Sequence, residues 1–298
     1  MIEKFAHIGE ISAFISAILW AFGVILYKKS GESLHPITLN IFKISLSLIL
    51  FIPFLIIFKI PILPSLSPYE YLIFFISGLL GIALGDTLFF KSLNCIGAGL
   101  SAIIDCLYSP SIILISLLWL KENLTILQII GVVLIISGIL FTANFKHKEN
   151  KLTGNLIVGV ILGIIAILVM AVSVVMMKPL LNKVSIIWII IVRFAGALIG
   201  LLIILPFISY SNKIIEQFYS SKGIIYTFSG SLIGQYLSVI FWIAGFKYTQ
   251  ASIASAINQT SNIFIFIFAS IFLKEPFTIR KLIAFLLGIS GAFIVGFA

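Results

Sequence analysis

Two short stretches decide the fold: WLKENLTI at residues 119–126 and FLKEPFTI at residues 272–279. They share a Leu-Lys-Glu core at an offset of 153, and the offset continues without gaps to pair Gly138 with Gly291. A single Leu-Lys-Glu match could arise by chance. An ordered series of matches at one spacing indicates internal duplication.

A second series of matches relates the earlier parts of the two halves at an offset of 150. WAFGVILYKK falls on MAVSVVMMKP, which pairs Lys28 with Lys178, and further along Lys43 falls on Arg193. The two series lie in the same order along the chain. We therefore expect two repeats, at residues 1–149 and 150–298.

The composition is that of an integral membrane protein. Of the 298 residues, 61% are hydrophobic and only 10% are charged, with a mean hydropathy of +1.25. A soluble domain carries about 25% charged residues. The net charge of +9 comes from basic residues scattered singly between apolar runs. This pattern suits topology signals and anionic lipid headgroups, and it argues against nucleic acid as a partner.

Ten apolar runs are long enough to cross a membrane as helices, and no strand-like alternation is long enough for a barrel. A repeat with an odd number of spans inserts its second copy upside down. We therefore predict an all-α polytopic membrane protein whose ten transmembrane helices form two inverted five-helix repeats, an architecture that places substrate sites near the midplane. The predicted spans are residues 10–27, 37–58, 70–92, 97–120, 126–144, 155–177, 186–208, 223–246, 250–273 and 279–297.

These features resemble the EamA-type transporters of the drug/metabolite transporter superfamily. In that family each half has a proline-containing fourth helix, a glutamate corner and a glycine-spaced fifth helix. Ile263 stands where the second half would carry the proline. Arg193 matches the family's arginine at the start of the seventh span, and Lys43 is a variant of it. The other matching residues are Pro110, Glu122, Gly131, Gly138, Glu275, Gly288 and Gly291.

The resemblance covers almost the whole chain. It implies a central cavity and alternating access, but it does not specify the cargo. It also suggests that both termini are cytoplasmic. The loop charges instead argue for both termini outside, because the loops that would then be cytoplasmic carry more basic residues. The orientation therefore stays open.

Ionisable and polar side chains at membrane depth indicate a site, because each charge there costs at least about 2.5–3.5 kcal/mol on insertion scales. Asp86 lies inside the third span, while Lys91 lies near its end and should reach the headgroups. Polar stripes at three- and four-residue spacing mark the fourth and ninth spans, which are repeat mates. The candidate substrate-binding or proton-coupling residues are Trp20, Lys43, Asp86, Asp105, Tyr108, Arg193, Gln235, Trp242, Asn258, Gln259 and Asn262.

Structural alternatives stand beside these roles. Asp86 could be a neutral or ion-paired structural residue, and the polar stripes could join helices without lining a cavity. Lys43 and Arg193 could hold an anionic group of the cargo, pair with Asp86 or Asp105, or lie at the membrane interface. The tryptophans could be interface anchors.

The predicted function is secondary transport of small polar or amphipathic metabolites. The direction of transport stays open, with export as one alternative. No nucleotide-binding loop is visible, so the energy would come from a proton gradient, from exchange or from the cargo gradient alone. We expect no enzyme activity, cofactor or metal site. The expected partners are small-molecule cargo and membrane lipid. The chain would be a monomer or weak homodimer in the cell membrane.

Three rival functions remain. A flippase for lipid or lipid-linked sugar would share the architecture. An intramembrane aspartyl protease is suggested by ALGD at residues 83–86, with Asp105 as a second carboxylate. However, the first position of that motif is alanine where glycine is expected, and no Pro-Ala-Leu element follows. A channel or scaffold is the third rival, but no filter-like loop is visible.

Overall fold

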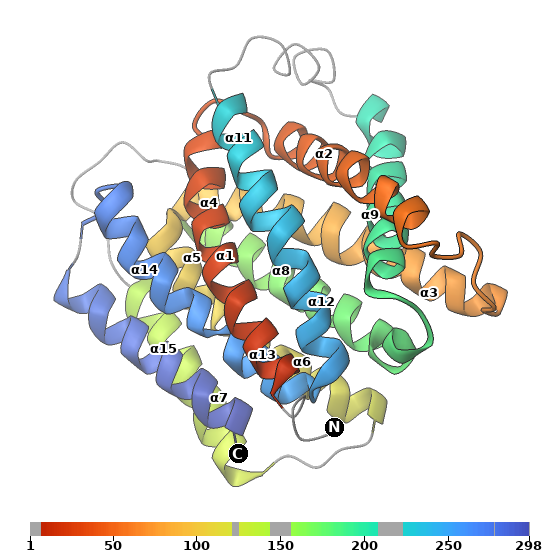
Figure 1. Cartoon of the computed structure of the whole chain (residues 1–298). Helices are drawn as coiled ribbons and strands as arrows, with labels where there is room; N and C mark the ends of the chain where they lie inside the picture. The colour runs from red at the N-terminus through yellow and green to blue at the C-terminus, as the bar shows by residue number, and fades with distance from the viewer. Residues whose placement is uncertain (1–6, 121–124, 144–155, 208–222, 277, 298) are drawn as a thin grey trace.

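The computed structural model describes residues 7–120, 125–143, 156–207, 223–276 and 278–297, which form a bundle of helices (Figure 1). The first Lys-Glu corner, Lys121-Glu122, and the boundary between the predicted repeats lie outside these residues. In the first half the helices are α1 (Ile8–Ser30), α2 (Pro36–Ile57), α3 (Pro68–Gly78), η2 (Leu79–Asp86), α4 (Thr87–Ile96), α5 (Ala98–Asp105), α6 (Tyr108–Leu120) and α7 (Ile126–Ala143). In the second half they are α8 (Leu156–Met177), η3 (Lys178–Lys183), α9 (Ile186–Ile204), η4 (Leu205–Phe207), α11 (Ile224–Gly230), η5 (Ser231–Leu237), α12 (Ser238–Tyr248), α13 (Ala251–Asn258), α14 (Thr260–Phe272) and α15 (Ile279–Phe297).

Every predicted span contains helix. Within the described residues, eight continuous helical segments are long and apolar enough to cross a membrane. The two predicted spans outside this set are α7 and α15, which pack against each other (Figure 1). The count of ten therefore stays a prediction. The start of α1 and the end of α15 lie at the same end of the bundle.

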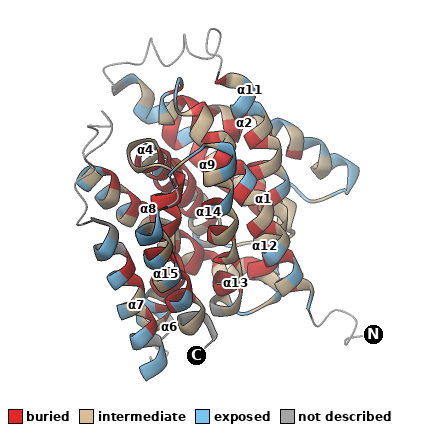
Figure 2. Ribbon diagram, turned by 90° about the vertical axis from the view of Figure 1, so that its left-hand side faces the viewer, coloured by how far each residue is buried: buried red, intermediate tan, exposed pale blue. Residues whose placement is uncertain are grey.

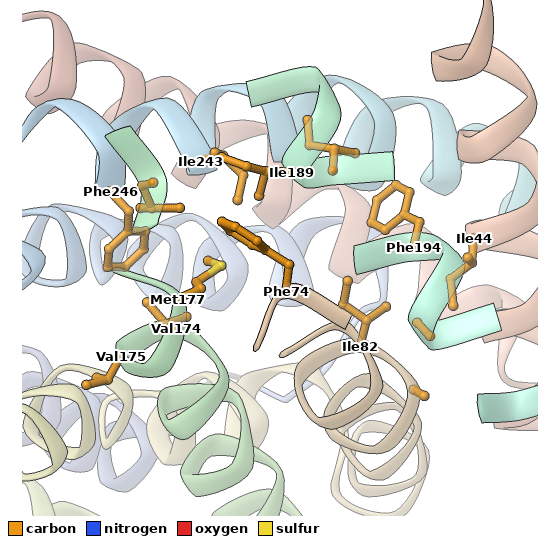
Figure 3. Close-up of a cluster of buried hydrophobic side chains, with 14 of the residues drawn as sticks. Ile44, Phe74, Ile82, Val174, Val175, Met177, Ile189, Phe194, Ile243 and Phe246 are labelled. Carbon is orange, nitrogen blue, oxygen red and sulfur yellow. The ribbon is translucent and has the colours of Figure 1, made fainter. Parts of the chain in front are cut away.

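Figure 2 shows that exposed and buried residues alternate along the helices, and many of the exposed ones are large and apolar. Leu118 is 79% exposed, Ile56 78% and Ile126 77%. Such a surface is unfavourable in water and suits the hydrocarbon of a bilayer. The interior contains a large cluster built from α2, α3, α8, α9 and α12, where side chains such as Phe74, Met177 and Phe246 meet (Figure 3).

Several of the long helices are not regular α-helix throughout. The third and eighth spans each contain a π-helical segment, η2 and η5. The fourth span breaks between Asp105 and Tyr108, and the ninth turns at Gln259. Pro110 explains the first break, because its ring lacks an N–H and clashes with the carbonyl four residues earlier. All four irregularities fall in matching parts of the two halves.

Contacts between the two halves come in matched pairs. Ala13 of α1 packs against Gly245 of α12, where an added Cβ would lie 3.1 Å from the Ala13 Cβ. Gly163 of α8 packs against Ser92 of α4, where an added Cβ would lie 2.8 Å from the Ser92 Oγ. At the offsets of 150 and 153, Gly163 is equivalent to Ala13 and Gly245 to Ser92. The second contact is therefore the first with the halves exchanged.

The pair of α7 and α15 shows the same reciprocity. An added Cβ at Gly138 would lie 2.7 Å from the carbonyl oxygen of Ala284, and one at Gly291 would lie 2.5 Å from that of Gly131. At the offset of 153, Gly138 is equivalent to Gly291 and Gly131 to Ala284. Small residues at these positions let the two backbones approach closely, as is common where membrane helices pair.

The equivalent lysines of the early repeat bind the ends of equivalent helices. The Lys28 Nζ donates to the carbonyl oxygen of Asn94 at 3.2 Å, near the end of α4. The Lys178 Nζ donates to the carbonyl oxygens of Phe246 and, at 2.7 Å, Thr249, at the end of α12. Each lysine binds carbonyls that lack intrahelical partners and lies at the negative end of a helix dipole.

The close approach of α7 and α15 gives a stability prediction. Gly138→Ala and Gly291→Ala should each destabilise the protein by about 1–3 kcal/mol, because the new methyl group has to displace backbone atoms. Unfolding of the purified protein in detergent measures this effect. Val133→Ala, at a position 57% exposed on α7, is the control and should change little. Unchanged stability in both glycine variants would contradict the described packing.

Candidate functional site

A cavity of about 140 Å³ lies inside the bundle where the two halves meet. On the scale of one water molecule it holds several waters or one small solute. Both π-helical segments and both broken helices contribute to its wall. π-helical turns are frequent at functional sites. The lining residues are Ser16, Ala17, Trp20, Gly81, Ile82, Asp86, Phe89, Asp105, Tyr108, Met170, Ser173, Val174, Arg193, Gly234, Gln235, Ser238, Val239, Trp242, Asn258, Gln259 and Ser261.

Most of the residues singled out in the sequence lie around this one cavity, and two lie behind its wall. Lys43 is fully buried and reaches the cavity only through Asp86. Asn262 is also fully buried, and its amide donates to the Gln259 Oε1 at 2.7 Å. Lys43 thus takes the alternative of pairing with Asp86, while Asn262, expected to border the cavity, lies behind its lining. The nine candidates in the lining are Trp20, Asp86, Asp105, Tyr108, Arg193, Gln235, Trp242, Asn258 and Gln259.

Asp86 and Lys43 form an ion pair between the end of η2 and α2. The aliphatic and ammonium groups of Lys43 are enclosed, with the Nζ 5.0 Å from the centre of the Phe90 ring. One turn earlier, the Asn40 amide donates to the Ile82 carbonyl at 2.8 Å and to the Thr87 Oγ1 at 2.9 Å. These bonds fasten α2 to the π-helical segment. Asp86 thus has a fixed counter-charge at membrane depth.

Arg193 is held by a hydroxyl group and an aromatic ring, and it interacts electrostatically with the Asp86 carboxylate at longer range. Its guanidinium on α9 donates from Nη2 to the Ser173 Oγ at 3.1 Å and lies 5.2 Å from the centre of the Trp242 ring. Ser173 in turn donates to the Ser77 carbonyl at 2.7 Å. Among the described residues, no carboxylate forms a salt bridge with Arg193. The guanidinium is only 4% exposed, so it is a positive charge held at the cavity wall by a hydroxyl group and an aromatic face.

Asp105 provides a carboxyl group elsewhere in the same wall. It stands at the break between α5 and α6, where the chain leaves regular helix and a side chain can project into the cavity. The Asn262 amide lies beside its carboxyl group. Within the described part of the chain, no basic side chain forms a salt bridge with Asp105. The cavity wall therefore contains an arginine and a carboxyl group that form no salt bridge among the described residues.

This geometry does not assemble the carboxylate pair of an aspartyl protease. Such chemistry needs two carboxyl groups that share a proton. Asp86 is engaged by Lys43, and no hydrogen bond between Asp86 and Asp105 occurs among the described residues.

Lys91, expected at the membrane edge, is exposed.

Sequence reasoning missed the small and apolar part of the lining. Ser173 holds Arg193, yet single serines are common in membrane helices and carry no signal by themselves. The repeat does contain a usable signal, because Ser173 is equivalent to Gly23 at the offset of 150. Gly23 packs on Gly234, and Ser173 packs on Gly81. Gly81 and Gly234 are themselves equivalent at the offset of 153. The other missed polar residues are Ser16, Ser238 and Ser261.

The buried ion pair gives a second prediction. Lys43→Met should destabilise the protein by about 3–5 kcal/mol, because it leaves the Asp86 carboxylate buried without its partner. The double variant Lys43→Met/Asp86→Asn should recover most of that loss. Chemical unfolding in detergent measures both variants.

The exposed pair of Lys183 and Glu70 is the control, and Lys183→Gln should have little effect. A Lys43→Met protein as stable as the parent would show that the pair is not needed for stability.

Comparison with known proteins identifies the family. The sequence model of the EamA-like transporter family matches residues 7–144 and 157–297. An uncharacterized transporter from Methanothermobacter thermautotrophicus is 25% identical over 303 aligned positions, which cover 96% of this chain and 85% of that protein. A solved structure, named only "Crystal structure of protein", has the same fold, with a TM-score of 0.69 at 14% identity over 96% of this chain and 95% of the other. Together with the apolar helices, the family and the relative indicate an integral, multi-pass membrane transporter. The chain belongs to the EamA-like transporter family.

Proposed function

We propose that the chain is a secondary transporter that moves small polar or amphipathic metabolites through the central cavity by alternating access. The observation that carries the proposal is the cavity itself, which lies between the two halves and has charged groups in its wall. Arg193 is a buried basic residue in that wall, and ionisable residues at membrane depth are costly and usually functional. Export remains one open direction, and the protein would act as a monomer or weak homodimer in the cell membrane.

The proposed mechanism needs two inverted five-helix repeats, residues 1–149 and 150–298, with α7 and α15 as their fifth spans. The reciprocal contacts support this arrangement. Pairs such as Ala13–Gly245 and Ser92–Gly163 exchange partners between the halves, as a two-fold axis requires. An odd number of spans in each repeat would place that axis in the membrane plane.

Alternating access would then use equivalent contacts at the two ends of the cavity. The helix α1 crosses η5 at Gly23 and Gly234, and α8 crosses η2 at Ser173 and Gly81. Because these crossings are equivalent, a rocking motion that tightens one can loosen the other. The π-helical segments at both crossings have irregular hydrogen bonding that can absorb such a change.

Accessibility of a cysteine in the cavity tests the mechanism without knowledge of the cargo. Cys95 and Cys106 are first replaced by alanine, and Met170→Cys is introduced into the lining on α8. A membrane-impermeant thiol reagent should label this cysteine in right-side-out and in inside-out vesicles, because the cavity opens to each side in turn. Leu168→Cys, at a position 45% exposed on the same helix, faces the lipid and should be labelled in neither.

Labelling of Met170→Cys from one side only would contradict alternating access and leave a one-sided pocket. Passage of the reagent into the vesicle lumen would indicate an open channel and would also contradict the proposal.

A further inference from the structure

We propose that a second, smaller pocket at the break in the fourth span binds one sodium ion through the side-chain oxygens of Asp105, Ser101 and Ser92. The pocket lies between α4, α5 and α8, beside the central cavity. It takes an inorganic cation and not the cargo, and it differs from the sequence-based expectation of no metal site. The binding site stands without the proposed transport function, whereas its coupling to transport rests on that function.

Three side chains with oxygen atoms line this pocket. Ser101 and Asp105 are four residues apart on α5 and therefore lie on one face of that helix. Ser92 is contributed by α4. The remaining lining consists of Phe89, Ile104, Gly163 and Ile167. The polar side chains thus border one small space with apolar surroundings.

The Ser101 hydroxyl is the observation that points to a ligand. Ser101 is only 4% exposed, and its Oγ is buried without a hydrogen-bond partner in the described part of the chain. Buried polar atoms nearly always have a partner in folded proteins. The pocket is too narrow for a water molecule, so water does not fill this role. A ligand that binds oxygen and is smaller than water is therefore needed.

The other two groups have lone pairs available for a cation. The Ser92 Oγ donates its proton to the Gly159 carbonyl at 2.7 Å, which leaves its oxygen free to bind an ion. Asp105 forms no salt bridge with the described residues. It is also the last residue of α5, so the negative end of that helix dipole lies at the same place.

The ligand set selects a small monovalent cation. Carboxylate and hydroxyl oxygens suit hard cations. A divalent ion would leave one positive charge without compensation in apolar surroundings, and Mg²⁺ usually keeps several waters for which the pocket has no room. Potassium is about as large as a water molecule, whereas sodium is smaller. A proton would neutralise Asp105 but leave the Ser101 hydroxyl without a partner.

The second half shows that the helix packing does not require these oxygens. The residues equivalent to Ser92, Ser101 and Asp105 at the offset of 153 are Gly245, Ala254 and Asn258. The equivalent place therefore lacks both hydroxyl groups and the carboxylate, although Gly245 packs against α1 as Ser92 packs against α8. The three oxygens together are specific to the first half, as expected for a binding site.

Asp105 connects the pocket to the central cavity, because it lines both. A sodium ion bound there neutralises the carboxyl group and holds it on the side of the pocket. The ion thereby changes the charge that the cavity wall presents. Since a ligand shifts a conformational equilibrium by its differential affinity for the two states, bound sodium would bias the cavity toward one side of the membrane.

Binding of radioactive sodium to the purified wild-type protein in detergent tests the site, with choline chloride keeping the ionic strength constant. We expect saturable binding at one site per chain, displaced by unlabelled sodium and less well by potassium. Sodium should also raise the unfolding temperature relative to choline, because it binds the folded state. The absence of saturable sodium binding would overturn the proposal, even if pH alone changes the stability.

Two variants assign the ligands. Asp105→Asn should abolish saturable sodium binding, and Ser101→Ala should weaken it at least about 10-fold, because a buried partner of the ion is lost. Both introduce the residue found at the equivalent position of the second half, so the helix packing should tolerate them.

Ser47→Ala is the matched control, because the Ser47 Oγ is also buried without a partner among the described residues but lies outside both pockets. Its sodium binding should be unchanged. Unchanged binding in Asp105→Asn, or an equal loss in Ser47→Ala, would overturn the assignment. The wild-type titration decides whether sodium binds even if a variant does not fold.

Labelling of Met170→Cys in sodium and in choline separates the cation site from the transport function. We expect sodium to raise labelling from one side of the membrane relative to the other. Sodium binding with the same two-sided labelling in both salts would uphold the site and contradict its coupling. Sodium binding with labelling from one side only in both salts would uphold the site and contradict alternating access. Two-sided labelling without sodium binding would uphold alternating access and overturn the sodium site.

Discussion

The ion pair between Lys43 and Asp86 is the interaction on which the centre of the bundle depends. A lysine that is fully buried among apolar helices needs a partner, and Asp86 supplies it from the end of a π-helical segment. The pair holds α2 against η2, and Asn40 adds hydrogen bonds one turn away. Asp86 binds Lys43 directly and also interacts electrostatically with Arg193 at the cavity wall. The carboxylate therefore links the buried lysine to the arginine that lines the cavity.

The same bundle is built from two copies of one packing scheme. Glycine and other small residues bring α1 against α12, α8 against α4 and α7 against α15, and each contact has an equivalent with the halves exchanged. Without a hydrophobic driving force between helices in lipid, such close packing supplies much of the association energy. It also leaves the cavity where the π-helical segments and the broken helices prevent the halves from closing completely.

The sequence predicted the helices well and the site in part, for physical reasons. Long apolar runs fix where helices lie, and the offsets of 150 and 153 relate the halves, so each predicted span contains helix. The cost of buried charge singled out Asp86, Arg193 and Asp105. Which charge pairs with which could not be predicted, because Lys43 and Asp86 lie on different helices and are 43 residues apart in the sequence. The π-helical turns also left no recognisable pattern in the sequence.

The two halves differ at positions around the cavity. Asp105 is equivalent to the neutral Asn258, whereas Lys43 and Arg193 are equivalent and both basic, but Lys43 pairs with Asp86 behind the wall and Arg193 lines the cavity. At the offset of 153, Asp86 is equivalent to Val239 and Gln235 to Ile82, and all four line the cavity. A perfectly symmetric wall would present the same groups from both halves and would hold a cargo equally well in two opposite poses. The substitutions remove this equivalence, because the two halves place different side chains around the cavity. In the proposed mechanism, the duplicated fold would supply the symmetry that alternating access needs, and its divergence would give the cargo one preferred pose.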